Sequence, residues 1–61
     1  MECLAIFTGT RRFDLELQII VHTASAAKQE VKDLKAMGCD DARAKPFKDE
    51  SAAYDWYEAN R

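Results

Sequence analysis

The hydrophobic pattern changes its period near residue 23, and this change constrains the fold more than any other feature of the sequence. Before it, every second residue is large and apolar, which is typical of a strand with alternate side chains on opposite faces. The series is Phe13, Leu15, Leu17, Ile19 and Val21. After it, apolar residues recur at spacings of four, three and three, as on one stripe of a helix; they are Ala27, Val31, Leu34 and Met37. The sequence therefore predicts a long strand followed by an amphipathic helix.

Polar and small residues mark the ends of this helix. Ser25 is the predicted N-cap, because its hydroxyl can accept a hydrogen bond from a free amide of the first turn. Gly38 can adopt the positive φ that ends many helices. Lys35 lies in the last turn, where a cation suits the helix dipole. We therefore expect the helix to lie between Ser25 and Gly38.

Three further elements are predicted around this pair. Residues 2–8 are mostly apolar and end in a Thr-Gly-Thr turn, which predicts a short strand. Residues 42–45 predict a second short strand that Pro46 stops, with Phe47 as an anchor in the core. Asp49 is expected to cap a helix that runs to about Asn60. The predicted order is strand, strand, helix, strand, helix.

This order predicts an α/β fold with a three-stranded sheet. The second strand, the first helix and the third strand form a βαβ unit, whose strands are expected to be parallel and whose crossover is expected to be right-handed. The first two strands are joined by a link too short for a parallel return, which usually needs a dozen or more residues. They are therefore expected to form an antiparallel hairpin.

The length and charge of the chain limit what it can do. Its 61 residues make one small domain, and 17 large apolar side chains remain when ten alanines and two cysteines are set aside. Because so small a domain buries only about 60% of the surface of its unfolded chain, it must pack tightly, dimerise or depend on a partner. Nine basic and eleven acidic residues give a net charge of −2. This balance argues against a nucleic-acid partner, which would require a clustered basic surface.

The sequence also argues against several other classes of protein. It contains no long apolar run that could span a membrane and no signal-peptide pattern, so we expect a cytoplasmic protein. Cys3 and Cys39 could pair in a disulfide, but reduced thiols are the expected state in that compartment. One histidine and two distant cysteines are too few for a structural zinc site. With no nucleophile–base pair and no glycine-rich phosphate loop, we predict no metal, no cofactor and no enzymatic activity.

Residues 19–47 resemble the C-terminal half of a response-regulator receiver domain, the flavodoxin-like phosphoacceptor module of two-component signalling. Three motifs at family spacing carry the resemblance: Thr23-Ala24, Gly38-Cys39-Asp40-Asp41 and Lys45-Pro46-Phe47. The helix expected to end near Asn60 stands where the last helix of the family would be. The resemblance implies half of a flavodoxin-like fold over residues 19–61, preceded by a new strand region over residues 1–18.

The resemblance also implies roles for three residues. Thr23 corresponds to the switch hydroxyl and Lys45 to the lysine, both of which contact the phosphoryl group in the family. Pro46 corresponds to the proline that follows a cis peptide bond and sets the direction of that lysine. Lys45 could still bind an anion, or its side chain could simply be solvated at the end of the strand. Thr23 could instead be a polar strand end.

The chain lacks other parts of the receiver machinery. The acidic pair that holds Mg²⁺ in the family has no counterpart, and neither has the aspartate that accepts the phosphoryl group. Ala42 occupies the position of the switch aromatic. The resemblance therefore implies a receiver-like fragment without phosphotransfer, although Asp14 and Asp41 remain the least favoured candidates for a residual acceptor.

A predicted interaction face follows from the same resemblance, because receivers contact partners through their fourth helix, fifth strand and fifth helix. The corresponding residues here are Lys28, Lys32, Lys35, Arg43, Tyr54, Trp56 and Tyr57. The three aromatic residues could instead belong to the core. His22 is expected to be structural, and Asp40-Asp41 is expected to form a turn.

Two functions remain as expectations. The first is a non-catalytic, engineered or recombined receiver fragment that folds by self-association into a homodimer, since half of a doubly wound sheet leaves an unpaired edge. The alternative is a small regulatory module that contacts a receiver or a histidine kinase through the predicted interaction face.

Overall fold

The computed structural model describes residues 2–10 and 14–61. Its elements follow the predicted order: β1 (Cys3–Thr8), β2 (Glu16–Val21), α1 (Ala24–Ala36), β3 (Arg43–Phe47) and α2 (Glu50–Asn60). The predicted α/β class is confirmed. Phe13, predicted as the first residue of the second strand, lies outside the described residues.

The three strands form one sheet in the order β2-β1-β3, with β1 antiparallel to both neighbours. The predicted antiparallel hairpin of β1 and β2 is confirmed. β2 and β3 run parallel to each other, as expected for the two strands of a βαβ unit, but β1 lies between them. The N-terminal strand therefore occupies the centre of the sheet.

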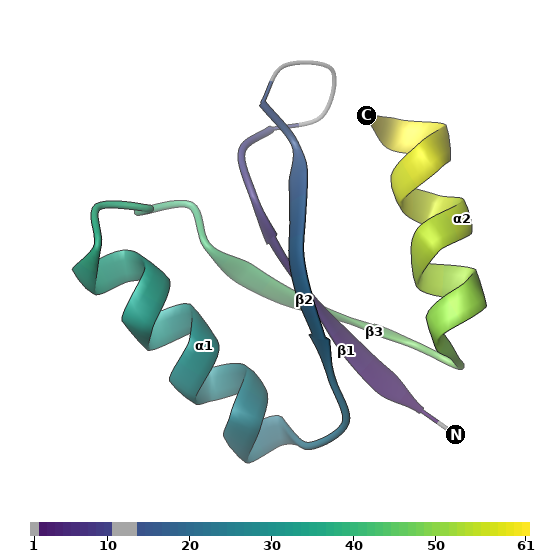
Figure 1. The fold of residues 1–61 in the computed structure, drawn as a ribbon, viewed down its shortest axis with the longest axis horizontal. Coiled ribbons are helices and arrows are strands. Elements are labelled where there is room, and N and C mark those ends of the chain that lie inside the picture. Colours follow the sequence, from purple (N-terminus) through teal and green to yellow (C-terminus); the bar gives the residue numbers. More distant parts are fainter. Residues whose placement is uncertain (1, 11–13) are drawn as a thin grey trace.

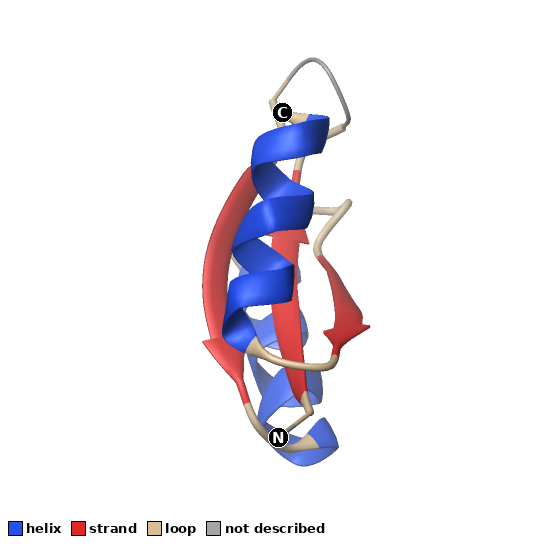
Figure 2. Cartoon of the chain, turned by 90° about the vertical axis from the view of Figure 1, so that its right-hand side faces the viewer, coloured by secondary structure: helices blue, strands red, loops and turns tan. Residues whose placement is uncertain are grey.

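The two helices cover opposite faces of this sheet. Figure 1 shows the sheet between α1 and α2, and Figure 2 shows α2 in front of the strands with α1 behind them. The molecule is a thin slab of 28 × 28 × 11 Å, because the sheet is only three strands wide. Within residues 2–10 and 14–61, no further strand flanks β2 or β3, so both outer strands present an open edge.

A β-bulge interrupts the expected alternation in β2. Ile6 pairs with Ile19, whereas the next residue, Phe7, pairs with Leu17, so Gln18 is the extra residue. An extra residue moves all later side chains to the other face. Leu17 and Ile20 both pack toward the cluster under α2, and Ile19 is 40% exposed. The prediction that all odd-numbered residues of this strand share one face is therefore wrong beyond the bulge.

The main core lies between the sheet and α2. Its buried members are Ala5, Phe7, Leu15 and Ala53, and partly buried apolar residues pack around them. The Phe7 ring lies 5.1 Å from the Trp56 ring and 6.4 Å from the Phe47 ring, centroid to centroid. The Tyr57 hydroxyl donates a hydrogen bond to the Leu15 carbonyl at 3.3 Å. Phe47 is thus the core anchor that the sequence predicted.

Side-chain caps and one glycine define the helix ends. Thr23, not Ser25, is the N-cap of α1: its hydroxyl accepts from the Ala26 amide at 3.1 Å. The prediction of Ser25 is wrong because the helix begins two residues earlier than that cap would place it, at Ala24. Gly38 has the expected positive φ, 103°. Asp49 caps α2 as predicted, accepting from the Ala52 amide at 2.8 Å.

Pro46 lies within β3 and does not stop the strand. It pairs with Leu4, and Phe47 continues the strand opposite Cys3. An edge strand tolerates proline, because the missing N–H can face solvent. No cis peptide bond occurs within the described residues, so the Lys45–Pro46 bond is trans and the prediction of a cis proline is wrong. The ladder with β1 continues without interruption through Lys45, Pro46 and Phe47, as in a regular strand of trans peptide bonds.

Candidate functional site

The residues expected to remain from a phosphate switch do not form a common site. Thr23 follows β2, and its hydroxyl is engaged in capping α1. Lys45 lies in β3, beyond the central strand, where it pairs with Ala5. Its Nζ is 5.2 Å from the centre of the Trp56 ring and 5.8 Å from that of Phe47. Lys45 therefore packs against the aromatic residues under α2, and no described hydrogen bond joins it to Thr23.

The predicted interaction face is divided between the two faces of the sheet, and only Lys28, Arg43 and Trp56 of its members line a hollow described below. Lys28, Lys32 and Lys35 are exposed on α1, and Arg43 is exposed on β3. Trp56 and Tyr57 are half-buried against Phe7, so they contribute to the core, whereas Tyr54 is 51% exposed. The three lysines thus lie on α1, whereas Arg43 lies on the α2 side of the sheet with Trp56.

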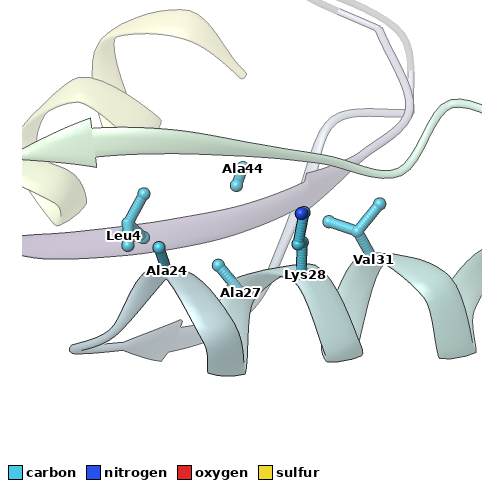
Figure 3. Close-up of a pocket in the computed structure, with 6 residues that line it drawn as sticks. All are labelled: Leu4, Ala24, Ala27, Lys28, Val31 and Ala44. Carbon is cyan, nitrogen blue, oxygen red and sulfur yellow. The ribbon is translucent and has the colours of Figure 1, made fainter.

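The first hollow, which we call the α1 groove, lies between α1 and the strands β1 and β3. It has a volume of about 300 Å³ and is lined by Leu4, Ala24, Ala27, Lys28, Val31 and Ala44. Figure 3 shows the Lys28 side chain extending from the helix toward the strands, beside Val31. Small alanine side chains on both sides leave this groove open.

The second hollow, which we call the α2 hollow, lies between β3 and α2. It has a volume of about 500 Å³ and is lined by Phe7, Leu15, Arg43, Ala44, Lys45, Trp56 and Asn60. Phe7 and Leu15 are almost fully buried, whereas Arg43 and Lys45 are exposed. The hollow therefore combines an apolar floor with a cationic rim. Sequence analysis missed it, because its lining comes from four separate parts of the chain.

The outer edge of β2 is the third candidate feature. Its last three residues, Ile19–Val21, follow the bulge, and no second strand flanks them within the described part of the chain. α1 packs over β1 and β3, which leaves Ile19 uncovered. This edge therefore presents an apolar segment next to unpaired backbone groups.

Polar contacts occur at both ends of the sheet: one joins His22, after β2, to Glu50, after β3, and the other joins Gly9, after β1, to Asp41, before β3. His22 Nε2 lies 3.7 Å from Glu50 Oε2, and both side chains are about half exposed. Sequence analysis did not find this partner, since the two residues are far apart in the chain. Asp41 accepts a hydrogen bond from the Gly9 amide at 2.9 Å, which fits the turn role expected for it. Within residues 2–10 and 14–61, no three metal-binding side chains gather.

The two thiols are free, as expected. Cys3 is buried in the central strand, and its pKa is raised above the usual 9.0 by this burial and by the nearby carboxylates of Glu50 and Asp49. A nucleophilic cysteine needs the opposite shift, because the thiolate is the reactive form. The environment of Cys3 therefore disfavours nucleophilic chemistry.

Within the described residues, neither α1 nor α2 has the length and apolar composition of a membrane-spanning helix. A scan of protein families, a search of curated proteins and a search of solved structures each found no match to this chain.

Proposed function

We propose that this protein is a non-catalytic, receiver-like module that acts by associating with a second copy of itself through the β2 edge. The observation that carries the proposal is the exposure of Ile19, 40% of whose surface is accessible on an open strand edge. Unpaired strand edges tend to pair with another chain, and small cores gain stability from oligomerisation.

The β2 edge suits pairing better than the β3 edge does. β3 carries Pro46, which lacks a backbone donor, and the exposed cations Arg43 and Lys45. Proline and charged side chains are both devices that protect edge strands from pairing. In β2 the bulge at Gln18 interrupts the strand, but Ile19–Val21 forms a regular apolar segment after it. Antiparallel self-pairing of this segment would place Ile19 beside Val21 of the second copy.

The receiver relationship is part of this proposal. The succession of β2, α1, β3 and α2 supports it, because receivers have the same succession in their C-terminal half. In the flavodoxin-like order 2-1-3-4-5 the last two strands are neighbours, whereas β1 separates β2 and β3 here. We infer a recombined half-domain in which an N-terminal strand has entered the sheet. The capping role of Thr23 and the aromatic packing of Lys45 support the absence of phosphotransfer.

Light scattering after size exclusion, from low micromolar to millimolar concentration, tests the association. We expect a concentration-dependent dimer whose circular dichroism spectrum shows helix and strand. Ile19→Lys should shift the equilibrium at least about tenfold toward monomer, because a charge at the edge opposes pairing. Met37→Lys is the matched control, since Met37 is 78% exposed at the end of α1, away from this edge. A folded monomer at all concentrations would exclude the proposal.

A second candidate function is suggested by the basic stripe on α1. Lys28, Lys32 and Lys35 are exposed and form no ion pair with other described residues, which suits an acidic surface on a receiver or a histidine kinase. NMR titration with such a domain should shift α1 signals, and Lys28→Glu with Lys32→Glu should abolish the shifts. Binding that survives this double charge reversal would argue against the stripe.

A further inference from the structure

The α2 hollow has the size and lining of a small-molecule site. Its volume of about 500 Å³ lies within the range of roughly 300–1,000 Å³ that is usual for ligand pockets. Phe7 is 1% exposed and Leu15 is 5% exposed, so its floor is fixed by the core. Trp56 is tilted against Phe7 at 59° with centroids 5.1 Å apart, which leaves part of the indole facing the hollow. A flat apolar group could pack against this surface.

The rim of the hollow carries two cations without a carboxylate partner. Arg43 donates a hydrogen bond from Nη1 to the Asp41 carbonyl at 2.9 Å, and Lys45 lies over the Trp56 ring. Within the described residues, the two ion pairs are His22–Glu50 and Arg61–Glu58, so neither rim cation is neutralised. In a chain of net charge −2, this is a local site of positive charge.

Asn60 completes the lining with a polar group at the end of α2. Its Nδ2 donates to the Trp56 carbonyl at 2.7 Å, which leaves the amide oxygen available as an acceptor. The hollow thus offers an aromatic surface, two cations and one free acceptor.

We propose that the α2 hollow binds a small aromatic carboxylate. The ring packs against Trp56 above the floor formed by Phe7 and Leu15, and the carboxylate lies on the Arg43 guanidinium next to the Lys45 ammonium. Arginine is suited to this role, because its planar guanidinium can hold both carboxylate oxygens. The hollow lies on the β3 side of the sheet, so the proposal is independent of pairing at the β2 edge.

NMR titration of the full chain with 2-naphthoate tests the proposal. The chain has one tryptophan, so its indole N–H signal reports directly on the hollow. We expect saturable shifts of this signal and of the Asn60 side-chain amide, with a Kd of about 1 mM for a ligand of this size. 2-Naphthamide, which has the ring without the charge, and acetate, which has the charge without the ring, should each bind roughly tenfold or more weakly.

Variants separate the site from a general charge effect. Arg43→Gln should weaken naphthoate binding about tenfold, because it removes the charged fork that holds the carboxylate. Lys32→Gln removes an exposed cation from α1 and should leave the Kd unchanged. The proposal is wrong if naphthamide binds as tightly as naphthoate, or if the two variants weaken binding equally. Absence of a saturable Trp56 shift at concentrations more than about ten times the expected Kd would also overturn it.

Discussion

The two faces of the sheet are covered in different ways, although each helix fully buries only one residue and that residue is an alanine. Ala53 holds α2 against the sheet and Ala27 holds α1. Around Ala53, four aromatic residues fill the space, with Phe7 in contact with the rings of Phe47, Trp56 and Tyr57. Around Ala27, alanines and Val31 leave the α1 groove open. An alanine lets a helix approach closely, but the residues beside it decide how much apolar area is buried.

This contrast predicts that the α2 side supplies most of the stability. Phe7→Ala should lower the free energy of unfolding by about 3–5 kcal/mol, because it removes the ring on which the aromatic cluster packs. Val31→Ala, on the half-buried side of α1, should cost only about 1 kcal/mol. Urea denaturation followed by circular dichroism measures both values. Equal losses would show that the two faces contribute alike.

The N-caps of α1 and α2 also differ in how strongly they are expected to stabilise the fold. Thr23→Ala and Asp49→Ala should each cost about 1 kcal/mol, since each removes the acceptor of a first-turn amide. The Asp49 variant should cost more, because its hydrogen bond is shorter and partly buried, 2.8 Å against 3.1 Å. Thr23→Ser should restore stability by thermal denaturation. A failure of serine to do so would remove the capping explanation for Thr23.

The smallest expected effect concerns Cys3 and alkaline pH. The pKa of this thiol is raised in the folded state by burial and by Glu50 and Asp49, so the unfolded chain loses its proton first as the pH rises. The contribution of the protonated Cys3 thiol to the stability of the folded state is fully present below pH 9.0 and is lost above it. Cys3→Ala should show a weaker decline of stability than the parent chain between pH 8 and 10. Parallel declines in urea denaturation would contradict the assigned shift.

Local signals in the sequence predicted the elements well. The change of hydrophobic period near residue 23 predicted the strand–helix order. Asp49 predicted the cap of α2, and Gly38 predicted the end of α1. Each of these signals acts within a few residues of the chain. The short link between the first strands likewise predicted their hairpin. The cap of α1 was missed because Thr23 and Ser25 are chemically equivalent candidates two residues apart.

The errors arise where the outcome depends on distant residues. The sequence of β1 does not show that β3 pairs with the edge of β1 opposite β2, because the hydrophobic pattern of a strand does not determine which strands pair with it. The bulge at Gln18 adds one residue and reverses the faces of Ile19 and Ile20, which no alternation count can anticipate. The α2 hollow escaped for the same reason: Leu15, Arg43 and Trp56 come together only after the sheet and α2 have packed.

The central place of β1 has a consequence for the order in which the chain can fold. A two-stranded hairpin is at best marginally stable in water, and three strands or a packed helix are needed for independence. The first neighbour of β1 follows within a few residues, but the second, β3, comes some forty residues later. During synthesis β1 is made before β2 and β3, but its pairing in the sheet is complete only after β3 has been made. Its second ladder must wait for a distant contact of the kind that slows folding.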